Sequence, residues 1–322
     1  MNLMKVVVTR KIPRVGIDVL EDAGLEVVGN PSDRLLTEAE MKDFVKGADA
    51  ILCLIVDRID KEVINAAGSN LKIIANYGVG FDNIDVEYSK SKGIMVANTP
   101  SELSSRAVAE FTFGLIFALL KRIVEGDEFA RRGDMGGWKP EIFLGENLEG
   151  KTLGIIGLGR IGSLVAQIAR AFGLRVVYNK RNRDLEAEKR YKLEYMSFEN
   201  LLRESDIVSL HIPLTPETKH LINSRTLELM KDDAYLINTS RGGVVDEVAL
   251  VEYLKKGKLA GAALDVYEYE PEINPELCGL PNVVLTPHIA SSVQAVRDDM
   301  AIMAAKNIVE ALNGKVPTNL VK

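Results

Sequence analysis

A stretch near the middle of the chain, residues 152–183, constrains the fold more than any other. It reads TLGIIGLGRIGSLVAQIARAFGLRVVYNKRNR, in which two apolar runs flank a glycine-rich turn and a helical apolar pattern. That order is strand, turn, helix and strand, the context that a dinucleotide-binding GxGxxG motif requires. In this motif Gly157 makes the tight turn, Gly159 lets backbone approach a pyrophosphate, and Gly162 lets the helix pack on the strand.

The helix after this turn begins near Arg160. The N–H groups of its first turn and the positive end of its dipole attract phosphate. We therefore predict that a dinucleotide contacts the turn and the start of the helix, at Gly157, Gly159, Arg160, Ile161 and Gly162.

Length and composition limit the class of protein. A chain of 322 residues exceeds one typical core and suggests two domains. The net charge of −6 lacks the basic footprint of nucleic-acid binding, so we predict no nucleic-acid partner. Cys53 lies in an apolar run and Cys278 in a loop, a usage that predicts neither a disulfide framework nor a metal site.

No apolar segment predicts export or membrane insertion. The N-terminal run is too short for a signal peptide, and the apolar stretch 111–120 is about half a membrane span. We predict a soluble, cytoplasmic protein without a membrane partner.

β-rich runs alternate with helical patterns along the chain, which predicts an α/β fold with parallel sheets and helices on both faces. The predicted strands are 6–9, 25–28, 50–56, 71–75, 94–97, 153–156, 174–178, 206–210, 235–238, 262–266 and 283–286. The predicted helices, besides the one after the glycine turn, are 15–23, 38–45, 61–67, 247–255 and 291–313.

One further helix is predicted over 101–124, with Ser101 as its cap and Glu102 in its first turn. It is apolar on nearly every side, which indicates burial or a subunit interface. A charged segment, 125–132, and a glycine-rich loop, 133–137, follow it.

Three histidines are candidates for proton transfer. His220 has charged neighbours and is interpreted as a solvated surface residue. His211 and His288 both follow predicted strands, where open α/β sheets bind their ligands, and the residues alone leave the two nearly equal.

Two further charged positions follow strands. Arg241 comes after the strand 235–238, where its guanidinium is placed to bind a carboxylate, although an interdomain salt bridge is the alternative. Glu268 and Glu270 follow the strand 262–266, and nothing local distinguishes a functional acid from a surface charge.

Taken together, these motifs resemble the D-isomer-specific 2-hydroxyacid dehydrogenase family. The matching stretches are 157–162, 238–247, 263–266, 270–271 and 286–289, and 76–85 and 98–100 also fit. The resemblance implies that His288 is the acid/base, Glu270 its partner, and Arg241 the anchor of the substrate carboxylate and carbonyl. It thereby favours His288 over His211.

The chemistry agrees with these implied roles. Reduction of a 2-oxo acid needs a hydride on carbon and a proton on oxygen, and a histidine can supply that proton near neutral pH. A neighbouring carboxylate favours the imidazolium form. An arginine that holds the carboxylate and polarises the carbonyl fixes the face presented to the nicotinamide.

The resemblance also implies the remaining ligand contacts. The backbone at Gly78, Val79 and Gly80 is similar to the family's second carboxylate cradle, and Asp265 would bind the nicotinamide carboxamide unless it is a buried structural acid. We further predict substrate contact by Ser291 and cofactor contact by His288 and by four residues at strand ends, His211, Pro213, Thr218 and Thr239.

The family's architecture explains why the glycine motif comes late. It implies two Rossmann-like domains, with a doubly wound nucleotide-binding domain (99–286) inserted into a flavodoxin-like substrate domain (1–98 and 287–322). Residues of about 101–150 would form a dimerisation arm, which implies a homodimer.

Within the family, the chain is most similar to glyoxylate/hydroxypyruvate reductases. Residues 137–140 resemble the loop whose tryptophan, here Trp138, reaches the neighbouring subunit's active site; a hydrophobic plug on the arm is the alternative. The partner implied is a small 2-oxo or 2-hydroxy acid.

The end of the second strand of the nucleotide unit bears on cofactor choice. NAD-preferring members carry an acid there for the ribose 2′-OH, whereas this chain has amide and cationic residues and the acid Asp184 comes too late. We predict NADP(H) over NAD(H), without a carboxylate to repel the 2′-phosphate; a solvated turn is the alternative. The residues concerned are Asn179, Lys180, Arg181 and Arg183.

Two other functions remain open. D-lactate or D-3-phosphoglycerate dehydrogenase is the alternative within the enzyme class. A nucleotide-sensing binding protein, like the C-terminal-binding-protein corepressors, is the alternative of another class, and the acidic balance and the intact Arg241, Glu270 and His288 set count against it.

Overall fold

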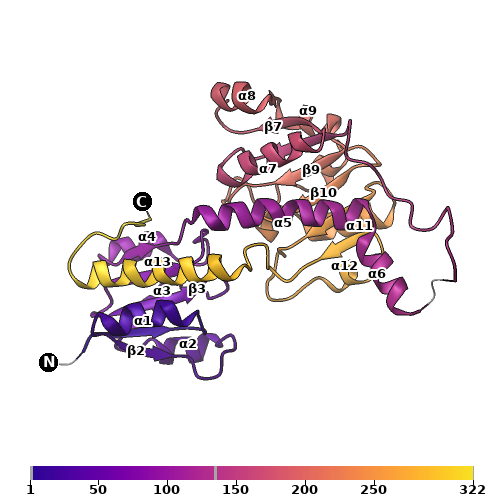
Figure 1. Ribbon diagram of the computed structural model, residues 1–322. Coiled ribbons are helices and arrows are strands. Elements are labelled where there is room, and N and C mark those ends of the chain that lie inside the picture. The colour runs from indigo at the N-terminus through magenta and orange to yellow at the C-terminus, as the bar shows by residue number, and fades with distance from the viewer. Residues whose placement is uncertain (1–2, 134–135, 322) are drawn as a thin grey trace. The chain divides into compact units, whose positions relative to one another are not determined.

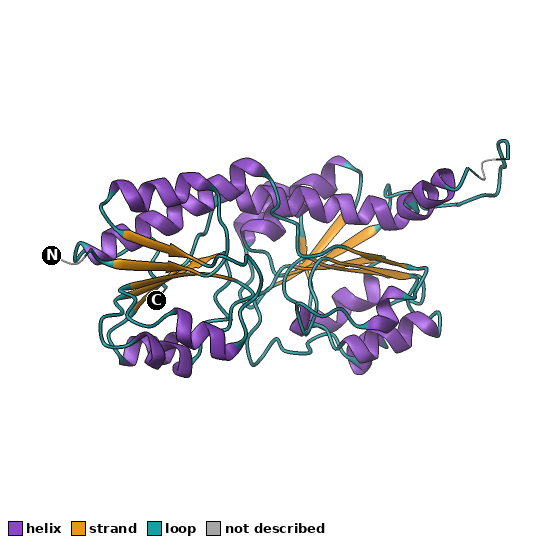
Figure 2. Ribbon diagram, turned by 90° about the horizontal axis from the view of Figure 1, so that it is seen from below, coloured by secondary structure: helices purple, strands orange, loops and turns teal. Residues whose placement is uncertain are grey.

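The computed structural model describes residues 3–133 and 136–321, and the chain divides into two compact units. Unit 1 comprises Met1–Ser104 and Ser292–Lys322, and unit 2 comprises Ser105–Ser291. The chain therefore leaves and re-enters unit 1 a few residues later than the predicted boundaries at 98 and 286. In each unit a parallel sheet lies between layers of helices (Figure 2).

Unit 1 contains a five-stranded parallel sheet in the order β2-β1-β3-β4-β5, which is the flavodoxin-like order. Its strands are β1 Lys5–Val8, β2 Glu26–Gly29, β3 Ala50–Leu54, β4 Ile73–Tyr77 and β5 Met95–Ala97. Its helices are α1 Arg14–Asp22, α2 Glu38–Phe44, α3 Lys61–Ala67, α4 Val86–Ser91 and α13 Gln294–Leu312.

The last helix of the chain completes unit 1. Figure 1 shows α13 beside α1, and their backbones approach closely because Gly16 has no side chain. A Cβ on Gly16 would lie 2.8 Å from the Cβ of Ala301. The C-terminal segment thus belongs to the core built by the N-terminal strands.

Unit 2 contains a seven-stranded parallel sheet in the order β12-β11-β10-β9-β6-β7-β8. The strands β6 to β11 follow the doubly wound order of dinucleotide-binding domains, and β12 is added at the edge beside β11. Its strands are β6 Thr152–Ile156, β7 Arg175–Asn179, β8 Glu194–Tyr195, β9 Ile207–Leu210, β10 Tyr235–Asn238, β11 Gly261–Leu264 and β12 Val283–Leu285. The predicted α/β class with two Rossmann-like sheets is confirmed.

The helices of unit 2 cover both faces of this sheet. They are α5 Glu102–Leu120, which begins in unit 1, α6 Ile123–Arg131, α7 Arg160–Ala171, α8 Leu185–Tyr191, α9 Phe198–Glu204, α10 Ser224–Leu227, α11 Glu247–Lys255 and α12 Pro275–Cys278, with a short 3-10 turn at Gly242–Val244. The predicted strands and helices end within about two residues of the observed ones, apart from the long helix after Ser101. The strand β8 and the short helices α4, α8, α9, α10 and α12 were not predicted. Each of these helices has at most seven residues and a weak apolar period, although α2 and α3, also of seven residues, were predicted.

The long helix predicted over 101–124 is correct up to Leu120 and wrong only over its last four residues. Ser101 does cap it, since the Ser104 N–H donates to Ser101 Oγ at 3.4 Å. The helix ends at Leu120, however, because Arg122 adopts a left-handed conformation with φ 53°, and α6 begins at Ile123. The predicted charged segment is therefore mostly helical. Residues 134 and 135 of the predicted glycine-rich loop lie outside the described residues.

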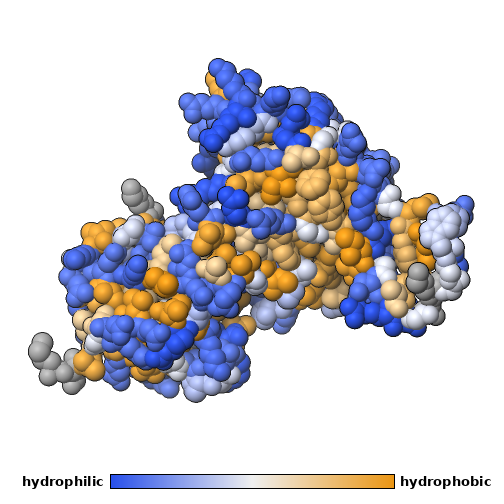
Figure 3. Space-filling view, viewed as in Figure 1, coloured by the Kyte–Doolittle hydropathy of each residue, from blue (hydrophilic) through white to orange (hydrophobic). Residues whose placement is uncertain are grey.

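Helix α5 is the one helix among residues 3–133 and 136–321 that is long and apolar enough to span a membrane, with a mean hydropathy of 1.5. In this structure 61% of its apolar window is buried, as in a core helix. The side chains of Phe113 and Ile116, both on α5, are buried in the hydrophobic core of unit 2. Figure 3 shows hydrophobic side chains gathered over α5 on this face, and exposed apolar side chains continue beyond it at Ile123 and Leu144.

Candidate active site

The glycine turn lies at the carboxyl end of β6, between neighbouring strands β7 and β9. Gly157 has φ +100°, a conformation that side chains rarely adopt, and a Cβ there would lie 2.4 Å from the His211 carbonyl oxygen. A Cβ on Gly162 would lie 2.1 Å from the Gly157 carbonyl oxygen, so only glycine lets α7 pack this closely on the turn. Gly159, by contrast, faces open space within 4 Å.

These three glycines fit a bound pyrophosphate. Gly159 caps α7 without a side-chain hydrogen bond, and the first turn of α7 holds no acidic residue, so Arg160 and Ile161 begin a helix whose positive end is not screened by a carboxylate. A phosphate group could therefore approach the backbone at Gly159 without a steric or electrostatic obstacle.

His211 follows β9 and lies beside this turn. Its Nε2 is 2.8 Å from Ser209 Oγ, while its buried Nδ1 has no hydrogen-bond partner among the described residues. Burial lowers the pKa of His211 to about 3, so the ring is neutral near neutral pH. A neutral imidazole is a much weaker proton donor than an imidazolium, which favours His288 on physical grounds as well.

Three other predicted cofactor residues, Pro213, Thr218 and Thr239, form hydrogen bonds within the protein. The Thr218 hydroxyl donates to the Pro213 carbonyl at 2.7 Å and accepts from the Thr215 N–H at 2.8 Å, which closes the loop after His211. Thr239 is buried, and its hydroxyl lies 3.0 Å from that of Thr112 on α5. Their contacts with a cofactor stay predictions.

The loop after β7 differs from the sequence interpretation. The Asn179 side chain donates to the Met196 carbonyl at 2.8 Å, and Lys180 Nζ lies 3.5 Å from Asp184 Oδ2. Arg183 pairs with both Glu188 carboxylate oxygens, at 2.7 and 2.8 Å. Two acids that the sequence interpretation did not connect with this loop therefore pair with its cations: Asp184, which caps helix α8, and Glu188, on α8 itself. That no carboxylate would repel a 2′-phosphate here stays a prediction.

Asp265, at the end of β11, holds the loop that follows β12. It is fully buried, and its carboxylate accepts bonds from the Thr286 hydroxyl at 2.7 Å and from the Ile289 and Ala290 N–H groups, each at 2.8 Å. Burial raises the pKa of Asp265, although these donors oppose the rise. The alternative of a buried structural acid thus has direct support, whereas contact with a carboxamide stays a prediction.

His288 lies on the loop that Asp265 holds. Its N–H donates to the Asp265 carbonyl at 2.9 Å, and its φ of 53° is left-handed, a conformation rare for residues other than glycine. Its Nδ1 is 2.8 Å from Glu270 Oε2, while Nε2 makes no hydrogen bond to the described residues. Both side chains keep about a quarter of their surface exposed, at 26% and 22%.

Glu270 is oriented in turn by the backbone. Its other oxygen, Oε1, accepts from the Tyr267 N–H at 3.0 Å. A carboxylate held this way accepts a hydrogen bond from the Nδ1–H group of His288 and orients the ring so that Nε2 points away from Glu270. The arrangement is that of a general acid with an orienting partner.

Arg241 follows β10 and is set by an asparagine turn. Asn238 donates to the Arg241 carbonyl at 2.9 Å and accepts from the Ser240 N–H and hydroxyl at 3.0 and 2.8 Å. The guanidinium is half-buried and donates to the Ser240 carbonyl at 2.9 Å. Arg241, Asp265, Glu270 and His288 all belong to unit 2 and follow its neighbouring strands β10, β11 and β12.

The loop after β4 in unit 1 has three consecutive carbonyl groups that are all bound. The Gly78 carbonyl accepts from the Thr99 N–H at 2.9 Å, that of Val79 from Asn98 Nδ2 at 2.6 Å, and that of Gly80 from Asn76 Nδ2 at 2.6 Å. The N–H groups of the same three residues donate no hydrogen bond within the described part of the chain. A loop with bound carbonyls and unbound N–H groups suits an anion.

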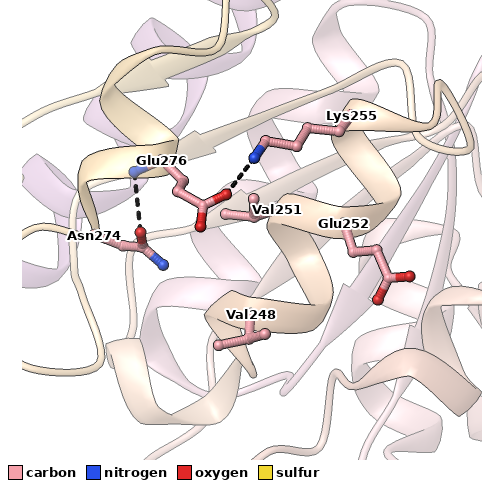
Figure 4. A pocket seen from close by; sticks show the side chains of 6 residues that line it. All are labelled: Val248, Val251, Glu252, Lys255, Asn274 and Glu276. Atoms are coloured by element: carbon pink, nitrogen blue, oxygen red, sulfur yellow. Dashed lines mark hydrogen bonds and ion pairs between the residues drawn. The ribbon is translucent and has the colours of Figure 1, made fainter.

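Two predicted substrate residues have little contact in the structure. Trp138 is 85% exposed, and Ser291 is half-buried at the last position of unit 2. A surface pocket of about 270 Å³ between α11 and α12 contains none of the predicted site residues; it is lined by Val248, Val251, Glu252, Lys255, Asn274 and Glu276 (Figure 4). Among the described residues no group of three or more His, Cys, Asp or Glu side chains gathers to hold a metal.

Comparison with known proteins identifies the family. A family model described as "D-isomer specific 2-hydroxyacid dehydrogenase, NAD binding domain" matches residues 113–290. The chain is also 47% identical over 322 residues to a glyoxylate reductase of Thermococcus litoralis, covering 98% of this chain and 96% of that relative. The chain belongs to the D-isomer-specific 2-hydroxyacid dehydrogenase family. It is therefore an NAD(P)-dependent oxidoreductase, as the resemblance implied.

Solved structures agree with the membership in this dehydrogenase family. A crystal structure of a Thermus thermophilus protein matches with a TM-score of 0.91 and 44% identity, covering 99% of this chain and 100% of that one. A structure of an NADPH-dependent glyoxylate/hydroxypyruvate reductase of Sinorhizobium meliloti, in complex with NADP and malonate, matches with a TM-score of 0.86 and 29% identity, covering 99% and 97%.

One pair in this dehydrogenase was missed from the sequence. The His220 side chain is 36% exposed, as expected of a surface residue, but its Nε2 lies 2.6 Å from Glu268 Oε1, and the Glu268 side chain is only 6% exposed. Glu268 is therefore not a surface charge. The partners lie 48 residues apart, and no local signal joins them.

Proposed function

We propose that this dehydrogenase reduces a small 2-oxo acid, glyoxylate or hydroxypyruvate, to the corresponding 2-hydroxy acid, glycolate or D-glycerate. The observation that carries the proposal is the His288–Glu270 pair, held by Asp265 on the edge of a dinucleotide-binding sheet. The relatives named as glyoxylate reductase and glyoxylate/hydroxypyruvate reductase support the choice of substrate.

The proposed chemistry divides between cofactor and protein. When bound, a reduced nicotinamide would supply the hydride for the carbonyl carbon. His288 donates the proton from Nε2 to the carbonyl oxygen, and Glu270 stabilises the imidazolium through Nδ1. Asp265 fixes the histidine loop and thereby limits the orientations from which that proton can be donated.

We propose that Arg241 of unit 2 binds the substrate carboxylate, and that the loop 78–80 of unit 1 is an anion-binding loop. The guanidinium of Arg241 can pair with a carboxylate through two parallel hydrogen bonds and polarise the adjacent carbonyl. The unbound N–H groups at Gly78, Val79 and Gly80 supply the donors of the anion-binding loop, and their carbonyls are held away by Thr99, Asn98 and Asn76. Unit 1 thus has the proposed role of substrate domain, and unit 2 that of nucleotide domain.

We keep NADPH as the preferred cofactor but change the residue that carries the preference. Arg183 is engaged by Glu188 and stacks its guanidinium 5.8 Å from the centre of the Tyr195 ring. Arg181 is exposed and has no ion pair within the described residues, which supports it as the main partner of a 2′-phosphate.

A homodimer through the arm of about 101–150 is proposed from exposed apolar side chains. Ile123 is 53% exposed, Leu144 66% and Trp138 85%, values that fit surfaces covered by a partner. Light scattering on the wild-type protein and a Leu144→Ser variant tests this; a monomeric wild type would refute it.

The predicted cytoplasmic location is likewise kept as a proposal for cell fractionation to test.

The function is tested by initial rates with glyoxylate, hydroxypyruvate, pyruvate and 3-phosphohydroxypyruvate, each with NADPH and NADH. We expect the highest kcat/KM for glyoxylate or hydroxypyruvate with NADPH. A preference for pyruvate or the phosphorylated acid would replace the proposed substrate, and the absence of turnover with cofactor binding intact would favour a binding protein.

A further inference from the structure

The segment 267–271 carries two histidine–carboxylate pairs. Glu270 bonds to His288, and two residues earlier Glu268 bonds to His220. The second pair is the shorter, at 2.6 Å, and its carboxylate is the more buried, at 6% exposure. The His220–Glu268 pair takes no part in the proposed proton transfer. The burial of the Glu268 carboxylate still needs an explanation, because a carboxylate is rarely buried without a partner.

The backbone of His220 is attached to a different part of the site. Its N–H donates to the Gly243 carbonyl at 2.9 Å, and Gly243 follows Arg241 by two residues. Its carbonyl accepts from Asn223 Nδ2 at 2.7 Å, and its φ of 51° is left-handed. A non-glycine residue keeps that conformation only where its surroundings determine it.

The Arg241 and Glu270 segments also touch directly. A Cβ on Gly242 would lie 1.8 Å from the carbonyl carbon of Tyr267, so the two backbones are in contact. His220 therefore bridges two touching segments, by its backbone to the one after Arg241 and by its side chain to the one before Glu270.

The charges around Glu268 make this bridge necessary. Its N–H donates to Glu247 Oε1 at 2.7 Å, and Glu247 is buried and lies within electrostatic range of both Glu268 and Glu270. The Tyr269 hydroxyl also lies near Glu268, whose carboxylate raises the pKa of that tyrosine. Three carboxylates thus lie close together, and without His220 their repulsion would displace the segment that presents Glu270.

We propose that His220 is a positioning residue, which fixes Glu270 relative to Arg241 through Glu268 on one side and Gly243 on the other. The inference rests on the proposed function for its kinetic consequence. Its structural consequence, the orientation of the His288–Glu270 pair, does not depend on which substrate is reduced.

The test compares His220→Leu, which removes the bond to Glu268, with His220→Gln, whose side-chain amide can still donate it. We expect His220→Leu to lower kcat by about tenfold through misplacement of the acid while the Kd for NADPH stays within about twofold. His220→Gln should recover most of the loss. The matched control is Lys219→Ala, the exposed neighbour, which should match the wild type. A wild-type kcat in His220→Leu, or an equal loss in Lys219→Ala, would overturn the proposal.

A second readout needs no turnover. The chain has three histidines, so the ring ¹⁵N resonances of His288 can be assigned by substitution. In His220→Leu they should move toward the positions found in Glu270→Ala, which lacks the partner carboxylate. Unchanged resonances would refute the positioning role even if no 2-oxo acid is a substrate, whereas a shift without any wild-type turnover would refute the proposed function alone.

Should His220→Leu not fold, Glu268→Ala removes the same bond together with one of the three carboxylates, so smaller changes of the same sign in kcat and in the His288 resonances are expected. If both single variants fold, the double variant should be no slower than either, because both remove one interaction. Additive losses would contradict the bridge.

Discussion

Two regions at the edge of the sheet in unit 2 are built in opposite ways. The loops after β11 and β12 hold Asp265, Glu270 and His288 through bonds that join residues 18 to 25 positions apart, and most of the partners are at least partly buried. The loop after β7 holds charges that pair with near neighbours, Lys180 with Asp184 and Arg183 with Glu188, and all four side chains except that of Glu188 are at least a third exposed.

The difference teaches which property each region can set. Buried, long-range bonds define one geometry, as proton transfer requires. Exposed ion pairs are worth roughly 1 kcal/mol or less each and rearrange readily. The chemistry of this family member is therefore expected to be hard to change, and its choice between NADPH and NADH easy.

His288→Gln should give the largest effect. Glutamine keeps a polar group but cannot donate the proton as an acid, so kcat should decrease by roughly 10²–10⁴-fold. The Kd for NADPH, measured by fluorescence titration, should stay near the wild-type value. A variant that keeps more than about a tenth of the wild-type kcat would show that another group donates the proton.

Asp265→Asn should give the next largest effect. One carboxylate oxygen becomes an amide, which cannot accept from an N–H, so a buried donor of the loop loses its partner at a cost of about 1–3 kcal/mol. We expect a lower Tm and a kcat reduced by about 10–100-fold through displacement of His288. A lower Tm with unchanged kcat would mean that Asp265 stabilises the fold without orienting the acid.

Arg181→Ala and Arg183→Ala sharpen the comparison at the exposed region. Loss of Arg181 should weaken NADPH binding by about tenfold, equivalent to about 1.4 kcal/mol, and leave NADH binding unchanged. Loss of Arg183, which Glu188 already engages, should have a smaller effect. If the ratio of the Kd for NADPH to the Kd for NADH is the same in wild type and in Arg181→Ala, Arg181 does not determine the cofactor preference.

Glu247→Gln should give the smallest effect and concerns stability. Burial raises the pKa of Glu247, and Glu268 and Glu270 raise it further. When the pKa of a carboxyl is higher in the folded than in the unfolded state, the folded protein loses stability as the pH rises from the unfolded-state pKa to the folded-state pKa. In that range the unfolded chain binds fewer protons than the folded chain. Thermal melts should show Glu247→Gln more stable than wild type at neutral pH, with no difference in acid below both pKa values. A destabilised variant at neutral pH would reverse this account.

The sequence predicted most of what depends on local pattern. The turn at 157–162 is specified by glycines at fixed spacing, and the structure gives Gly157 its positive φ and Gly162 its close packing. The alternation of strands and helices was likewise sufficient to predict the sheet class, since the apolar periods are clear in the long elements.

Features that depend on distant pairing or on one residue's conformation were not predictable. The break between α5 and α6 rests on the left-handed Arg122, and nothing in the surrounding residues marks it. The His220–Glu268 bond joins residues 48 apart. The pairing of Arg183 with Glu188 needs helix α8, which the sequence did not reveal.

The most direct test of the central claim is the product that the wild-type enzyme forms from hydroxypyruvate and NADPH, resolved by chiral chromatography. We predict stoichiometric oxidation of NADPH and formation of D-glycerate, as expected when one arginine and one histidine fix the face of a 2-oxo acid. L-glycerate, a racemic product, or no product from either hydroxypyruvate or glyoxylate despite NADPH binding would contradict the proposed site.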